Sequence, residues 1–209
     1  MGELRARNSE EINNRKKEIL DVTEDLFMNM EYQDITLAVI AEKTSISRPS
    51  MYNYYKTKEE VFLDLSKREY LLFNESLKSA FSRKMSREQF CKKMTDTLWK
   101  HQPFLKILSL HSSVIEEKCG TEVMYDYKKS VQPLFETFSL ILSKQFPDSS
   151  EQSREMFKVH FFMYAYSLYP AGHIPKDQAK VMQELKPFGD LPDMKHVFFD
   201  ALMSFSSAL

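Results

Sequence analysis

Residues Thr36–Phe62 read TLAVIAEKTSISRPSMYNYYKTKEEVF, and this stretch decides the fold. Thr36 is a suitable N-cap for a short helix whose apolar residues recur at helical spacing. A tight turn follows at residues 44–46, and Ser47 can cap a second short helix with Pro49 in its first turn. Two short helices joined by such a turn predict a helix-turn-helix motif.

Helices are also predicted on both sides of this motif, which spans about residues 36–55. An amphipathic helix of about 18 residues begins near Ile12. After the motif, Thr57 and Glu60 have the spacing of a capping box, so a long helix is expected to start there. Residues 12–66 therefore predict a compact three-helix domain.

The remainder of the chain, residues 67–209, predicts a larger domain that is helical throughout. Leucine (21 residues) and methionine (12) outnumber valine and isoleucine (nine each), and unbranched side chains lose less rotamer freedom in a helix. Ser86 and Pro103 stand where helices can begin, and Gly120 and Tyr169–Gly172 stand where helices can end. The predicted fold class is therefore all-α.

The composition excludes several classes of protein. Four glycines are few for this length, since average usage of about 7% would give roughly fourteen. No glycine-rich phosphate-binding loop can be written with them. The net charge of −1 gives no global basic excess, no apolar run is long enough to cross a membrane, and two cysteines cannot frame a disulfide scaffold. We therefore expect a cytoplasmic protein with no membrane partner.

The second helix of the motif carries groups that are suited to reading DNA. Arg48, Ser50 and Asn53 are polar or donor side chains of the kind that contact base edges in the major groove. The tyrosines and lysines that flank them are suited to phosphates. Arg48 and Asn53 can equally be ordinary exposed side chains.

The segment from Tyr32 to Phe62 resembles the DNA-binding region of tetracycline-repressor-type (TetR-family) regulators. Ser47, the apolar residue four positions later, Tyr52, the aromatic residues after it and Lys-Glu at 58–59 carry the similarity. One departure is Ser45, because many members have glycine at this turn. If the position requires a positive φ, serine there costs about 1 kcal/mol.

The resemblance implies a homodimeric transcriptional regulator, most often a repressor, that binds a palindromic operator in double-stranded DNA and responds to a small-molecule effector. The DNA-binding domain would be residues 12–66, and residues 67–209 would bind the effector and form the dimer. Residues near base edges or the adjacent backbone would be Thr36, Ser47, Arg48, Pro49, Ser50 and Asn53. Residues on phosphates would be Tyr52, Tyr54, Lys56 and Lys58.

The C-terminal domain offers candidates for the dimer interface and for an effector pocket. The helix predicted at about residues 151–169 is apolar all round, which indicates burial on two sides. The predicted interface residues are Phe157, Phe161, Tyr164, Leu168, Phe198, Leu202 and Phe205. The pocket candidates are Trp99, Phe104, His111, Tyr125, Phe138 and Tyr164. A filled core accounts equally well for any single pocket candidate.

Catalysis, metals and cofactors have little support in the sequence. His111, Glu116, Glu117 and Cys119 are close together, but Glu116-Glu117-Lys118 is more typical of a solvated helix end, and no nucleophile motif occurs. We expect no enzymatic activity, no metal and no cofactor. A second hypothesis is a helical ligand-binding or protein-interaction module whose helix-turn-helix no longer binds DNA specifically, since residues 1–60 hold nine Lys and Arg against twelve Asp and Glu.

Overall fold

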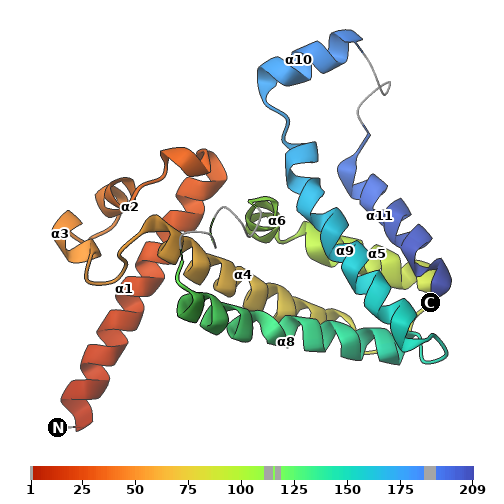
Figure 1. Ribbon diagram of the computed structural model, residues 1–209, viewed down its shortest axis with the longest axis horizontal. Coiled ribbons are helices and arrows are strands. Elements are labelled where there is room, and N and C mark those ends of the chain that lie inside the picture. The colour runs from red at the N-terminus through yellow and green to blue at the C-terminus, as the bar shows by residue number, and fades with distance from the viewer. Residues whose placement is uncertain (1, 111–114, 116–118, 186–191) are drawn as a thin grey trace. The chain divides into compact units, whose positions relative to one another are not determined.

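The computed structural model describes residues 2–110, 115, 119–185 and 192–209, and every regular element in those ranges is a helix (Figure 1). The predicted all-α class is confirmed. By their contacts, the residues group into two units. The first contains the chain up to Arg68 together with the first part of α8, up to Ser130, and the second contains the other helices. Two long helices, α4 (Lys58–Ala80) and α8 (Thr121–Gln145), contribute to both units.

The first unit is built on α1 (Gly2–Asn29), which is longer than the predicted helix beginning near Ile12. After it come the 3-10 turn η1 (Tyr32–Asp34), α2 (Leu37–Lys43), α3 (Arg48–Met51) and the start of α4. Their core residues are fully buried, and Phe27 of α1 meets Phe62 of α4 edge to face with ring centroids 5.1 Å apart. Since each short helix buries only a few residues, this shared core holds the motif together.

The second helix of the motif and the turn after it, from Ser47 to Tyr55, form what we call the recognition segment. This segment is less helical than the sequence predicts. Helix α3 ends at Met51, although its apolar pattern continues to Tyr55. The N–H groups of Asn53 and Tyr54 donate three residues back, to Ser50 and Met51, at 3.0 Å each. These shorter-range bonds tighten the chain into a turn, which brings the Tyr55 ring back into the core, where it is 3% exposed.

The second unit joins the later parts of α4 and α8 to α5 (Arg87–Trp99), α6 (Gln102–Ser109), α9 (Glu151–Gly172), α10 (Lys176–Leu185), α11 (Met194–Phe205) and the 3-10 turn η2 (Ser206–Ala208). Helix α9 packs against α6 and α11, and α11 packs against α5. Aromatic rings fill the core: Phe161 lies 4.9 Å from Phe138 and 5.5 Å from Phe198, centroid to centroid. Helix α10 has no buried residue.

Several helix boundaries in this unit confirm or correct the sequence analysis. Ser86 caps α5 through a capping box with Gln89, so the predicted helix start is confirmed. Helix α6 ends at Ser109, whereas the sequence predicted a helix continuing to Gly120. Helix α9 includes Pro170 and ends at Gly172, within the stretch Tyr169–Gly172 where the sequence predicts a helix end.

Two further observations concern the described part of the chain. No helix in it combines the length and the apolarity that a bilayer span requires. It also contains no group of three or more His, Cys, Asp or Glu side chains placed to hold a metal ion. His111, Glu116 and Glu117, which the sequence analysis weighed as metal-capable, lie outside the described residues.

Candidate nucleic-acid interface

The two helices of the motif begin at N-cap residues, Thr36 for α2 and Ser47 for α3, as the sequence predicts. Thr36 Oγ1 accepts a hydrogen bond from the Val39 N–H at 3.2 Å, and Ser47 Oγ accepts one from the Ser50 N–H at 3.4 Å. Ser47 Oγ also lies 2.8 Å from Ser50 Oγ. The N-caps are therefore confirmed, and both hydroxyls already have partners within the motif.

The predicted base-reading residues lie on the outer side of the recognition segment. Met51 is fully buried and holds α3 to the core. Thr36, Ser47, Arg48, Pro49 and Asn53 are exposed, and Ser50 is half-buried. Within the described residues, no carboxylate lies within ion-pair distance of Arg48. An exposed, uncompensated guanidinium next to exposed polar groups is the donor arrangement that major-groove recognition uses.

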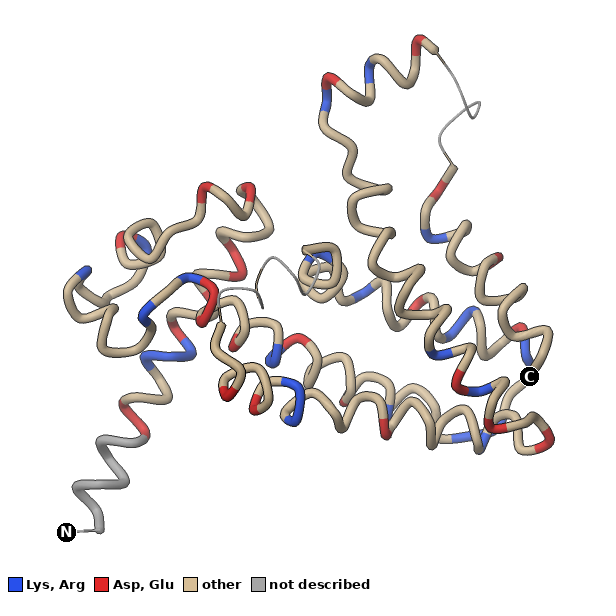
Figure 2. Tube along the Cα trace, viewed as in Figure 1, with Lys and Arg blue, Asp and Glu red and all other residues tan. Residues whose placement is uncertain are grey.

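The two lysines that follow α3 are held differently from Arg48. Lys56 is exposed, and its Nζ donates to the Tyr52 carbonyl at 2.7 Å. Lys58 is half-buried: its Nζ donates to the Tyr32 carbonyl at 2.8 Å and lies 4.1 Å from the centre of the Tyr32 ring. The Lys58 ammonium therefore helps to fix η1 against the start of α4. Figure 2 shows that the segment from α3 into α4 carries only Lys and Arg among its charged residues until α4 begins.

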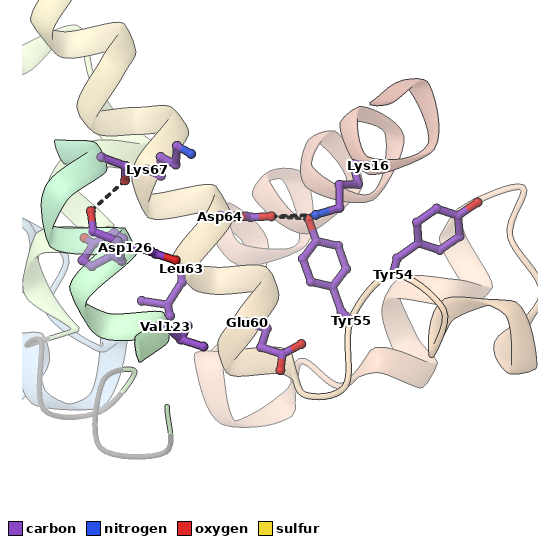
Figure 3. Close-up of a pocket in the computed structure, with 11 residues that line it drawn as sticks. Lys16, Tyr54, Tyr55, Glu60, Leu63, Asp64, Lys67, Val123 and Asp126 are labelled. Carbon is purple, nitrogen blue, oxygen red and sulfur yellow. Dashed lines mark hydrogen bonds and ion pairs between the residues drawn. The ribbon is translucent and has the colours of Figure 1, made fainter. Parts of the chain in front are cut away.

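The tyrosines of the segment separate into outer and inner side chains. Tyr52 is 48% exposed, as a phosphate contact requires. Tyr55 is buried, and its hydroxyl donates to Asp64 Oδ2 at 2.8 Å. Burial, followed by the negative charge of Asp64, raises the pKa of Tyr55. Lys16 of α1 reaches the same carboxylate oxygen at 3.4 Å, so three elements meet at Asp64 (Figure 3).

These residues border a cavity of about 270 Å³ inside the first unit. Its lining comes from α1, the segment after α3, α4 and the first part of α8 (Figure 3). Half-buried Tyr54 also lines it, with a hydroxyl that points away from Asp64 (Figure 3). Charges of both signs alternate around the cavity, with Lys16 and Lys67 among Glu60, Asp64 and Asp126. With such a lining, the cavity does not favour a ligand of one charge over the other.

The turn between α2 and α3 is tied to α1 through Ser45. The Ser45 N–H donates to Glu18 Oε1 at 2.5 Å, and the Ser45 hydroxyl donates to Glu18 Oε2 at 2.9 Å. Arg15 donates to the Ser45 hydroxyl and pairs with Glu18 at 3.3 Å. The backbone hydrogen bond from Ser45, followed by its hydroxyl, lowers the pKa of Glu18. The serine that departs from the family's usual glycine therefore contributes a side-chain contact.

The predicted effector-pocket residues that the structure describes differ in burial and are divided between the two units. Phe104 and Phe138 are fully buried among other rings of the second unit. Trp99 and Tyr164 are half-buried, and Tyr125 is 66% exposed in the first unit. His111 lies outside the described residues. Phe104 and Phe138 thus fill the core, the alternative that the sequence analysis left open.

Most of the predicted dimer-interface residues are covered by the chain's own helices. Phe157, Phe161, Leu168, Phe198 and Leu202 are each at most 2% exposed, and Tyr164 and Phe205 are half-buried. The uncovered apolar residues of α9 are instead Met156, Val159 and Met163, at 45%, 46% and 66% exposure. Their spacing of three and four residues places them in one row. The sequence did not single them out, because a helix that is apolar all round does not reveal which face packs inward.

The fold and the exposed motif define a helix-turn-helix DNA-binding protein, and comparison with known families identifies which kind. Residues 19–65 match the model for bacterial regulatory proteins of the tetR family, and residues 67–205 match the model for the tetracyclin repressor-like C-terminal domain. The chain belongs to the TetR family of transcriptional regulators. Regulators of this family are in general DNA-binding proteins rather than enzymes.

Solved structures share the fold at low sequence identity. The fatty acid degradation regulator FadR from Bacillus halodurans has a TM-score of 0.60 and 13% identity, with 91% of this chain and 94% of that one covered. A TerR/AcrR-family transcriptional regulator from Aquifex aeolicus VF5 has a TM-score of 0.55 and 18% identity, with 90% of this chain and 97% of that one covered. A TetR-family regulator from Mesorhizobium loti MAFF303099 has a TM-score of 0.54 and 12% identity, with 93% of this chain and 96% of that one covered. The comparison with curated proteins found no match.

Proposed function

We propose that this protein is a ligand-responsive repressor that binds a palindromic operator as a homodimer. The observation that carries the proposal is the recognition segment, where Arg48 and Asn53 are exposed while Met51 and Tyr55 anchor the same segment in the core. A short segment that is fixed on its inner side can present its outer side chains to base edges in a defined register.

Each exposed side chain then has a role that follows from its chemistry. Arg48 would donate to a guanine, and Asn53 would pair with an adenine edge. Thr36, Ser47, Pro49 and Ser50 would contact the neighbouring bases and backbone, and Tyr52, Tyr54 and Lys56 would contact phosphates. Lys58, whose ammonium has three donors and gives one to the Tyr32 carbonyl, would contact a phosphate while it also holds Tyr32.

The dimer would form through the row of Met156, Val159 and Met163 on α9. Two copies of one helix face related by a two-fold axis make a self-complementary contact, which is the usual form of a homodimer interface. A two-fold dimer presents two recognition segments and therefore requires a palindromic operator. The two recognition segments of the dimer can be held at a spacing that matches the operator or at one that does not. An effector that binds more tightly to the mismatched dimer would shift the population away from DNA binding.

Selection of bound sequences from random double-stranded DNA tests the central proposal. We expect a palindrome to be enriched, and Arg48→Ala to weaken its binding by about 5- to 150-fold, the equivalent of about 1–3 kcal/mol. Arg83→Ala is the matched control, because it removes the same charge from an exposed position outside the motif. If no sequence is enriched, the alternative of a helical interaction module without specific DNA binding is favoured.

The dimer is tested separately by sedimentation. Met163→Glu places a charge in the proposed interface and should shift the protein towards monomer. Leu72→Glu, at a position of α4 that is 49% exposed, is the control and should leave the oligomeric state unchanged. A Met163→Glu protein that sediments like the wild type would place the interface elsewhere.

A further inference from the structure

We infer that Glu18 is a positioning residue for DNA recognition: it holds the turn at Ser45 and so sets the register of the recognition segment. This inference rests on the proposed DNA-binding function. Glu18 lies on α1, 27 residues before Ser45, and contacts both its N–H and its hydroxyl. Arg15 closes the arrangement by contacting Glu18 and Ser45 together. One carboxylate thus holds the backbone and the side chain of one residue in the turn.

The recognition segment depends on such contacts because it cannot orient itself. Helix α3 has four residues, and so short a helix gains little stability from its own hydrogen bonds. Its end is fixed by Met51 and by the Tyr55–Asp64 hydrogen bond. Its beginning is fixed by buried Ile46 and by the Glu18–Ser45 contact. Removing Glu18 takes away the hydrogen bond that holds the Ser45 backbone and leaves buried Ile46 and the Arg15 contact to the Ser45 hydroxyl before α3, so the start of the segment can shift.

The contact is suited to positioning rather than to holding the fold together. The Glu18 side chain is 30% exposed, so its loss can be compensated in part by water. Hydrogen bonds to an ionised carboxylate are nevertheless directional and short, which fixes where the Ser45 backbone lies. Arg48 follows Ser45 by three residues, so a displaced turn moves the base-reading side chain directly. Base contacts need close geometry, whereas phosphate contacts tolerate displacement.

Three effects of losing Glu18 can therefore be separated by measurements on DNA. Loss of positioning weakens binding to the selected operator and leaves binding to unrelated DNA unchanged. Loss of a negative charge near DNA would strengthen binding to both. General unfolding of the motif would weaken both and lower the melting temperature.

The experiment compares Glu18→Ala with Glu11→Ala, which removes the same charge from an exposed position of the same helix. Affinity for the selected operator and for unrelated DNA is measured at one salt concentration. We expect Glu18→Ala to lower the ratio of the two affinities about tenfold and Glu11→Ala to change it less than twofold. Glu18→Gln, which keeps one acceptor for the Ser45 N–H, should recover part of the ratio. Equal ratios in the Ala variants, or a parallel loss of both affinities with a lower melting temperature, overturn the inference.

Hydrogen exchange of the Ser45 amide gives a readout that does not involve DNA. We expect the amide to be protected in the wild type and to exchange at least tenfold faster in Glu18→Ala, while amides in the middle of α1 keep their rates. If the wild type selects no operator, the proposed function fails although the exchange result still holds. If operator binding is intact but Ser45 exchanges alike in both proteins, the positioning role is refuted.

Discussion

Tyr55→Phe should destabilise the first unit by an amount that the structure allows us to work out. The ring is 3% exposed, and phenylalanine preserves its packing, so the change removes only the hydroxyl and its 2.8 Å hydrogen bond to Asp64. A hydrogen bond to a charged group contributes about 1.5–3 kcal/mol. Because the Asp64 side chain is 38% exposed and water can replace part of the bond, we expect about 1–2 kcal/mol.

The measurement is urea unfolding at neutral pH, supported by the melting temperature, which should fall by about 2–8 °C for a chain of this size. Tyr52→Phe is the matched control, because its hydroxyl is on an exposed side chain, and it should change the free energy of unfolding by less than about 0.5 kcal/mol. In an Asp64→Asn background the effect of Tyr55→Phe should shrink, since the pair would already be weakened. If Tyr55→Phe matched Tyr52→Phe, the reasoning that this bond anchors the recognition segment would be refuted.

Three further predictions concern the second unit and the thiols. Phe161→Ala should cost about 3–5 kcal/mol in urea unfolding, because the ring is fully buried among other rings, whereas partly exposed Phe135→Ala should cost less. Burial of the imidazole, followed by the positive charge of Lys100, holds the pKa of His101 below 6.5. As the pH falls below that value, the unfolded chain therefore binds more protons than the folded chain. Stability should therefore drop below about pH 6.5, and His101→Gln should flatten this dependence in melting curves recorded between about pH 5 and 7.5. Burial also raises the pKa of the Cys91 thiol, so alkylation followed by mass spectrometry should modify half-buried Cys119 first and reach Cys91 only with urea present.

The parts of the fold that depend on neighbouring residues could be predicted from the sequence. Capping by Thr36, Ser47 and Ser86 involves a side chain and an N–H three residues later, so the pattern is visible in a short window. The helical class followed from the same kind of local information. The helix-turn-helix was predictable because its two helices and their turn are continuous in sequence.

The contacts that position the motif could not be predicted, because they join distant residues. Nothing in the sequence near Glu18 indicates that its carboxylate lies on Ser45, and nothing near Lys58 indicates that its ammonium lies on the carbonyl and ring of Tyr32. The end of α3 was also missed, since a buried aromatic residue at position 55 fits a helix and a tight turn equally well. Local spacing is the same in both cases, and only the tertiary core decides between them.

The charges of the first unit show why its acidic composition does not oppose DNA binding. Asp21 and Glu24 both pair with Arg68, Asp21 also pairs with Lys17, and Asp64 pairs with Lys16, so three cations balance these three carboxylates inside the unit. The same pairing also occupies Lys16 and Lys17 of α1 and Arg68 of α4, which could otherwise have met phosphates. The exposed cations between Ser47 and Thr57 are Arg48 and Lys56. Because Lys16, Lys17 and Arg68 are paired in this way, we expect sequence-independent affinity to be low and binding to depend on the base contacts of the segment. We therefore expect specificity to come from the register of this short segment, so that the contacts that fix the register matter more than net charge.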